Sequence, residues 1–169
     1  MKNLVIVILV LVVGVLGYWQ FFKNNSSVNN SGSQPISANK ASSTGKTIDL
    51  SNKNLSKVDK DILDNRSVTT LDISGNNLTG ALPAEIRKLI NLEVLDASDN
   101  KMTGIPAEIG QLTKLRIADF SNNDITGLPL EIGNLKNLQT LDLRGNPKVS
   151  KYDISLIQPK IPNAKILTD

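Results

Sequence analysis

Aspartate recurs at a regular spacing in this chain and is the residue type with the clearest potential for chemistry. It holds the same place in five successive segments, as Asp49, Asp72, Asp96, Asp119 and Asp142, which we call the acidic ladder. Two carboxylates about 5 Å apart can serve as nucleophile and general acid in a retaining glycosidase, and clustered oxygens can hold Ca²⁺. Acid–base catalysis needs one carboxyl group whose pKa lies well above that of its partner. Nothing in the sequence sets one of these aspartates apart from the next.

The composition removes most other catalytic chemistry. The chain of 169 residues contains neither histidine nor cysteine, so the commonest general base, the commonest metal ligand and any thiolate nucleophile are missing. No aromatic residue is expected beside the aspartates, where a sugar ring would need a stacking surface. We therefore expect a non-enzymatic protein with no catalytic residue, no metal site and no cofactor. The acidic ladder remains a candidate for binding a basic peptide or a weakly held cation.

The aspartates belong to a segment that the chain repeats. Leu71–Leu78 reads LDISGNNL, and it returns as Leu95–Met102, as Ala118–Ile125 and, shortened, as Leu141–Asn146, at offsets of 24, 23 and 23 residues. A period of about 20 to 29 residues with leucine and asparagine at constant places is typical of a stacked solenoid. The units begin at Gly45, Val68, Leu92, Leu115 and Leu138.

Each unit combines a strand with a short helical segment. Apolar residues at the fourth and sixth positions of a unit alternate with polar ones, as in a half-buried strand. The ninth position is asparagine, whose amide can bond the backbone of the bend between two coils. The second half of the units repeats a Pro-x-Glu pattern, and proline suits the first position of a helix. We expect one short helix or 3₁₀ turn per unit there. The asparagines are Asn76, Asn100, Asn123 and Asn146, and the prolines are Pro83, Pro106 and Pro129.

These residues resemble the leucine-rich-repeat family, whose pattern is L-x-x-L-x-L-x-x-N-x-L. The resemblance covers about residues 45–146, and Leu78–Pro83 is similar to the signature of the plant-receptor subtype. It implies an α/β fold, a right-handed solenoid with a parallel sheet on its concave side and short helices or 3₁₀ turns on its convex side. It also implies recognition of a protein or peptide. In this family Leu-Asp-Leu-Ser is a common strand sequence, so the aspartates and serines can also serve simply to order the strand surface.

The third position of the units offers the most specific candidate for a binding centre. Val94 and Ile117 are apolar there, whereas Thr47, Thr70 and Thr140 occupy the same place in the other units. An apolar centre inside a charged rim is the usual anatomy of a protein interface. Isolated surface apolar residues are also ordinary. The expected rim comprises Asp96, Asp99, Lys101, Arg116, Asp119, Asp124 and Arg144.

An apolar segment precedes the repeats. Residues 4–22 carry no charge, and 19 residues of helix span roughly 28 Å, close to the hydrocarbon thickness of a bilayer. We expect residues 1–23 to form one N-terminal transmembrane helix, and a cleaved signal sequence is the alternative. Residues 24–45 are rich in asparagine and serine and predict a flexible linker. Residues 46–146 hold the repeats, and residues 147–169 are expected to cap the last coil and to end in a short strand at 165–167.

The charge and the composition narrow the setting. Beyond Lys40, 16 basic residues face 16 acidic ones, so no basic stripe for nucleic acid is expected. The asparagine, isoleucine and lysine bias without cysteine favours a bacterial source. We expect a single-pass membrane protein with an extracytoplasmic repeat domain, or a secreted one after signal cleavage. Its expected role is binding a protein or peptide through the concave sheet. The alternative is a structural envelope protein or self-associating scaffold with no small ligand.

Overall fold

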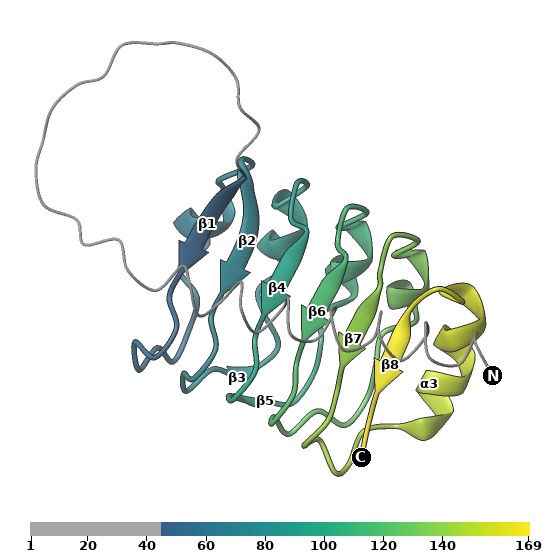
Figure 1. Ribbon diagram of the computed structural model, residues 1–169. Coiled ribbons are helices and arrows are strands. Elements are labelled where there is room, and N and C mark those ends of the chain that lie inside the picture. Colours follow the sequence, from purple (N-terminus) through teal and green to yellow (C-terminus); the bar gives the residue numbers. More distant parts are fainter. Residues whose placement is uncertain (1–44) are drawn as a thin grey trace, which may run out of the picture. The chain divides into compact units, whose positions relative to one another are not determined.

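The repeats stack into one parallel sheet. The computed structural model describes residues 45–169. Neighbouring strands in the six-stranded sheet come from successive units, in the order β1-β2-β4-β6-β7-β8 (Figure 1). They are β1 (Lys46–Asp49), β2 (Val68–Asp72), β4 (Val94–Asp96), β6 (Ile117–Asp119), β7 (Thr140–Asp142) and β8 (Lys165–Leu167). A second sheet pairs β3 (Thr79–Gly80) with β5 (Lys101–Met102), where the chain turns away from the main sheet.

Short helical segments cover the inner side of the sheet. The opening unit forms the α-helix α2 (Lys60–Leu63), and the next three form the 3₁₀ segments η1 (Ala84–Lys88), η2 (Ala107–Gln111) and η3 (Leu130–Asn134). The repeated prolines lie at the N-cap, one residue before the expected place, with ψ of 151°, 145° and 136°. An extended backbone at the cap suits proline and lets the chain enter each 3₁₀ turn directly.

The core consists of the repeated apolar rows. The strand positions that were expected to point inward are fully buried in the middle units, including Leu71, Leu95 and Leu141. In the first unit, Ile48, Leu50 and Leu55 are only half-buried, because β1 is the edge strand of the sheet. Coil-on-coil packing therefore supplies the burial, as the solenoid prediction requires.

The asparagine column joins each coil to the one before it, as predicted. The Asn100 amide donates to the Ile73 carbonyl of the preceding coil at 3.0 Å, and to the Ala97 carbonyl of its own coil at 3.2 Å. Its side-chain oxygen accepts the Leu78 N–H at 3.1 Å. Asn76, Asn123 and Asn146 bond in the same pattern. Each amide thus satisfies backbone groups that the bend would otherwise leave unpaired.

The C-terminal segment departs from the repeat and still extends the sheet. It forms α3 (Lys151–Ile157), the 3₁₀ turn η4 (Gln158–Lys160) and β8. The short strand expected at 165–167 is β8, and it pairs in parallel with β7. Ile157 and Ile161 are buried against the last coil. The segment therefore closes the apolar end of the stack.

The predicted membrane segment and linker lie outside the described residues. Within residues 45–169, no helix has both the length and the apolar character needed to cross a bilayer.

Candidate functional site

The strand register places the acidic ladder in one row. Asp49, Asp72, Asp96, Asp119 and Asp142 are paired strand to strand. Four of them are nearly buried, with exposed fractions of 8%, 9%, 9% and 4%, and only Asp49 on the edge strand is exposed. These four therefore form a largely enclosed row of carboxylates. Each is enclosed by the strands on both sides and by the residue two places further along the chain, just after its strand ends.

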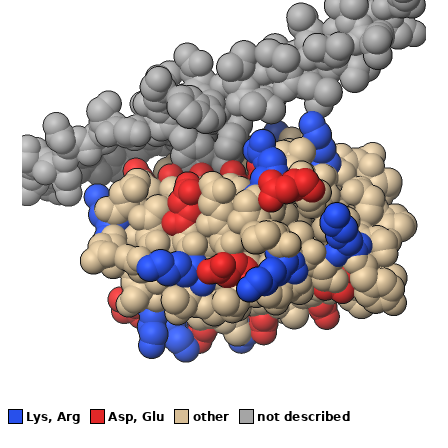
Figure 2. Space-filling model, turned by 90° about the horizontal axis from the view of Figure 1, so that it is seen from below, with Lys and Arg blue, Asp and Glu red and all other residues tan. Residues whose placement is uncertain are grey.

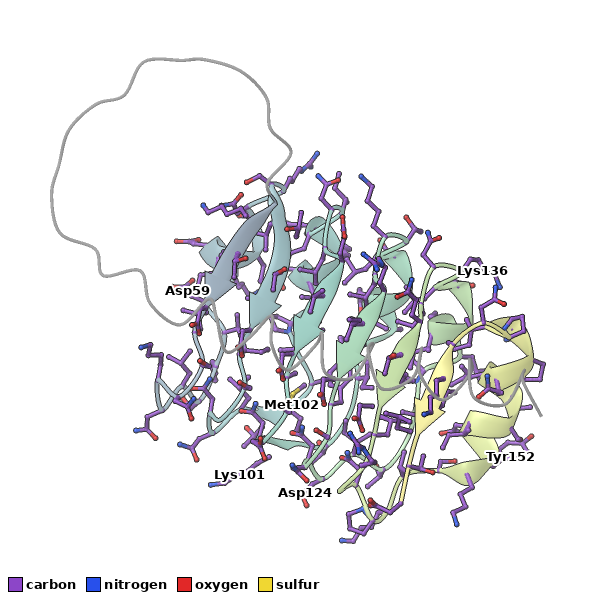
Figure 3. All side chains as sticks on the ribbon, viewed as in Figure 1. Asp59, Lys101, Met102, Asp124, Lys136 and Tyr152 are labelled. Atoms are coloured by element: carbon purple, nitrogen blue, oxygen red, sulfur yellow. The ribbon has the colours of Figure 1, made fainter. Side chains whose placement is uncertain are left out.

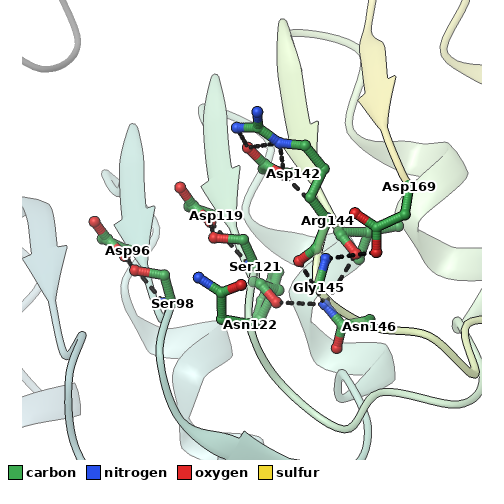
Figure 4. Close-up of polar contacts among 12 residues, drawn as sticks. Asp96, Ser98, Asp119, Ser121, Asn122, Asp142, Arg144, Gly145, Asn146 and Asp169 are labelled. Atoms are coloured by element: carbon green, nitrogen blue, oxygen red, sulfur yellow. Dashed lines mark hydrogen bonds and ion pairs between the residues drawn. The ribbon is translucent and has the colours of Figure 1, made fainter.

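The serines that follow the strands donate hydrogen bonds to these carboxylates. Oδ1 of Asp96 accepts the Ser98 N–H at 3.0 Å and the Ser98 hydroxyl at 2.6 Å (Figure 4). Asp72 and Asp119 bond Ser74 and Ser121 in the same way. These bonds close a tight turn at the end of each strand. They support the interpretation that the aspartates and serines order the strand surface.

Arg144 replaces the serine in the last full unit and holds its aspartate in another way. Its Nε donates to both carboxylate oxygens of Asp142, at 3.0 and 3.1 Å, and its backbone N–H donates to Oδ1. The guanidinium is exposed while the carboxylate is buried. Figure 4 also shows the neighbouring Gly145 N–H donating to Asp169 at 2.8 Å. Arg144 is therefore an exposed cation at the C-terminal end of the row.

Asp96 differs electrostatically from an ordinary aspartate. Burial raises the pKa of its carboxyl group to about 6, against the lowering effect of its two bonds from Ser98, and the charges of Asp119 and Asp72 add to the rise. The sequence predicted no such distinction. It arises mainly from burial, and the carboxylates at the paired positions of β2 and β6 add to it.

This raised pKa predicts that stability falls with rising pH. An unfolded aspartate titrates near pH 4, so the folded state binds the Asp96 proton more tightly than the unfolded state does. That contribution is complete below pH 4 and is lost as pH rises through about 6. The free energy of unfolding of the neutral variant Asp96→Asn, relative to that of its parent, should therefore rise by about 2 kcal/mol between pH 4.5 and 7.5. Urea unfolding at both pH values measures it, with Asp49→Asn as the exposed control. An equal difference at the two pH values would contradict the assignment.

The register also places the apolar pair side by side. Val94 is paired with Ile117, between Thr70 and Thr140 in the same row. Both apolar side chains are half-buried. They form a continuous apolar spot, next to the row of carboxylates, on the face of the sheet that points away from the core, which we call the outer face.

The expected charged rim divides between two edges. Arg116 precedes β6 at the edge where the strands begin, 3.6 Å from Glu93 and 3.4 Å from Gln139. Lys101 and Asp124 lie at the opposite edge, where the chain leaves the strands (Figure 3). Charged groups therefore lie at both edges of the sheet that carries the apolar pair.

Asp99 stands at the same end as Lys101, in a bend. Its φ is 54°, and its carboxylate accepts the Asn122 amide at 2.9 Å. Figure 2 shows basic and acidic side chains interspersed over the face seen from below. This distribution agrees with the charge balance of the repeats.

A shallow groove at the strand-start edge was not predicted from the sequence. It has a volume of about 290 Å³ and is lined by Glu93, Lys114, Arg116, Asn137 and Gln139. Glu93, Arg116 and Gln139 occupy the second position of three successive units. Reading that position as a column would have revealed their proximity. Among residues 45–169, no group of three acidic side chains is placed to hold a metal ion.

The family comparison agrees with this geometry. A model of the Leucine Rich Repeat matches residues 67–89 and 91–112, and a model of two such repeats matches residues 113–156. Together these segments cover more than half of the chain. The chain belongs to the leucine-rich-repeat family. No curated protein sequence matches it significantly.

Several solved structures are similar to this chain. A leucine-rich-repeat protein of Leptospira interrogans is 40% identical with a TM-score of 0.62, over 66% of this chain and 28% of that one. The plant peptide hormone receptor RGFR1, in complex with RGF2, is 30% identical with a TM-score of 0.59, over 75% and 20%. The match in the Arabidopsis thaliana BIR3–SERK2 complex is 29% identical with a TM-score of 0.60, over 72% of this chain and 66% of the matched one. The chain thus spans less than a third of the first two.

Proposed function

We propose that this leucine-rich-repeat chain is a non-enzymatic module that binds a protein or peptide through the outer face of its sheet. The observation that carries the proposal is the half-buried pair Val94 and Ile117, side by side between two threonines. Similar solved proteins have such partners: one is a peptide hormone receptor in complex with RGF2, and another is a complex of two proteins. An apolar spot with charges at its margins matches the anatomy of an interface.

The contacts of the carboxylates favour this centre over the acidic ladder as the binding element. Asp72 and Asp119 are nearly buried and already accept two bonds each from serine. The exposed charges stand at the edges instead, as Arg116 on one side and Lys101 and Asp124 on the other. We therefore expect a partner that covers the apolar pair and carries both acidic and basic groups.

Catalysis has less support. Asp96, whose pKa is raised, is paired with Asp119 on the next strand, but both side chains have exposed fractions of only 9%. Among residues 45–169 the aromatic side chains are Phe120, which is in the core, and Tyr152, which is on α3. Neither offers a sugar-stacking surface beside the carboxylates.

The binding centre is tested with paired substitutions. The double variant Val94→Lys/Ile117→Lys places two charges in the centre and should reduce the partner recovered by cross-linking in native membranes at least tenfold, about 1.4 kcal/mol. The matched control is Ile90→Lys, because Ile90 is an exposed apolar residue that follows η1 on the other side of the sheet. Retention of the same partners by the double variant would refute the proposed centre.

The second part of the proposal concerns how the repeats are held at a membrane. We propose that residues 4–22 stay in the mature protein and anchor the repeats outside the cytoplasm, since the run is uncharged and of spanning length. Mass spectrometry of the mature chain should find an N-terminus before residue 4, and protease should reach the repeats in intact cells. A mature chain that begins after residue 17 would show a cleaved signal instead.

A further inference from the structure

Exposed apolar side chains gather at the C-terminal end of the stack. Within the described part of the chain, the large apolar residues that are exposed are Ile90, Leu130, Tyr152 and Leu156. Leu130 belongs to η3 and the last two to α3, and these elements pack against each other. Tyr152 is 71% exposed and Leu156 is 37% exposed. They lie one helical turn apart and so share a face of α3, and Figure 3 shows Tyr152 at the far end of the stack.

Lysines occur in the same segments as this apolar group. Lys148, Lys151 and Lys160 are exposed and lie within or next to α3 and η4. We call Leu130, Tyr152, Leu156 and these three lysines the cap patch. A fourth lysine, Lys136, donates to the Lys160 carbonyl at 2.8 Å and lies at the end of the cap away from Tyr152 (Figure 3).

Acidic groups near the cap patch are fewer and partly engaged. Asp153 is half-buried, and its carboxylate accepts the Leu128 N–H at 2.9 Å. Asp169 accepts the Gly145 N–H. Glu131 on η3 is exposed. Within the segment 148–160 itself, three lysines therefore stand against one aspartate, an excess of positive charge, whereas the repeats as a whole are balanced.

We propose that the cap patch docks on an anionic lipid bilayer. A tyrosine with an exposed ring is suited to the headgroup level, where its apolar body and polar tip are both accommodated. Each lysine close to an anionic surface strengthens binding to that surface about fivefold. The excess of positive charge selects acidic headgroups over neutral ones.

Docking at the cap would leave the binding centre free. The cap patch lies on α3 and η3, whereas Val94 and Ile117 lie on β4 and β6 of the sheet. A partner can therefore reach the outer face of the sheet while the end of the stack contacts lipid. This inference shares the membrane setting of the proposed function but depends on different residues.

The experiment uses the full chain in nanodiscs of phosphatidylcholine, with or without one-third phosphatidylglycerol. The chain has no cysteine, so Ser155→Cys, exposed on α3, can carry one environment-sensitive fluorophore. Thr79→Cys, exposed on β3, is the control reporter. We expect a blue shift and quencher protection at residue 155 only, and only in anionic discs. Tyr152→Ser should weaken the shift at least twofold, and Lys148→Glu with Lys151→Glu and Lys160→Glu should abolish it.

Each other outcome has a definite meaning. A chain that inserts in both discs without a shift at residue 155 overturns the cap patch and leaves the anchor in place. An equal shift in both lipids overturns the selection of acidic headgroups. A shift that grows with protein concentration in the absence of lipid identifies a second copy of the chain as the occupant and overturns the bilayer. If the chain does not insert but residue 155 shifts with added anionic vesicles, the cap patch stands and the anchor fails.

Discussion

Replacing Asn123 with alanine is expected to lower the free energy of unfolding by about 3 kcal/mol or more. Asn123 is 5% exposed. Its amide donates to the carbonyls of Ala97 and Phe120 at 3.0 and 3.1 Å, and its oxygen accepts the Met102 N–H at 2.9 Å. Alanine would leave the Met102 N–H without its partner, and a buried unsatisfied group costs about 1–3 kcal/mol. The carbonyls of Ala97 and Phe120 also accept the amide of a neighbouring asparagine, so each would lose one of two side-chain bonds, at about 1 kcal/mol per bond. The loss falls between two coils, so it should also weaken their stacking.

Urea unfolding followed by circular dichroism measures this loss. Asn134→Ala is the matched control, because Asn134 is an exposed residue at the end of η3, and exposed substitutions usually change stability by less than about 0.5 kcal/mol. A loss below about 1 kcal/mol for Asn123→Ala would mean that water replaces the amide at the bend. The asparagine column would then not be what holds the coils together.

The asparagine column shows what the sequence could reveal. A residue type that returns at one place in every unit meets the same neighbours each time, so its role in one coil holds for all. That reasoning predicted the strands of the main sheet, one short helix or 3₁₀ turn per unit, and the bonds of Asn76 and Asn100 to the backbone, but not the second sheet of β3 and β5. The proline column was misplaced by one residue, since the same pattern suits both the N-cap and the first helical position.

The acidic ladder shows where such reasoning ends. Asp49 and Asp96 occupy equivalent positions in the repeat, yet one is exposed and the other nearly buried. The difference depends on how many coils lie on either side, which the pattern of one unit does not contain. The pKa of Asp96 follows from that burial and from carboxylates more than 20 residues away in sequence.

The binding surface was only partly predictable for the same reason. The pairing of Val94 with Ile117 follows from the repeat. The groove at Glu93, Arg116 and Gln139 depends on how long side chains from three coils fold over one edge. The exposure of Tyr152 depends on the packing of α3, in a segment without the leucine pattern that would indicate which face is buried.

Substitution of Gly110 is the second change expected to lower stability strongly, because neighbouring 3₁₀ turns approach each other closely there. A Cβ atom at Gly110 would lie 2.4 Å from the carbonyl oxygen of Glu131 in η3 of the next coil. Backbone cannot rotate away as a flexible side chain can, so the two coils would have to separate. Overpacking of this kind costs typically 1–3 kcal/mol, and we expect Gly110→Ala to lose about 3 kcal/mol because the contact is with backbone.

Two other glycines make this prediction a ranked series. Gly104 has nothing within 4 Å of the added atom, so Gly104→Ala should be neutral or should stabilise the protein by up to about 1 kcal/mol through the unfolded state. At Gly133 the added atom would meet the Lys160 side chain, with Cδ at 2.5 Å and Cβ at 3.0 Å. That side chain can move in part, so Gly133→Ala should fall between the other two. Thermal and urea unfolding of the three variants tests the order. If Gly110→Ala proves as stable as Gly104→Ala, the coils can separate freely, and the tight contact between η2 and η3 contributes little to the stack.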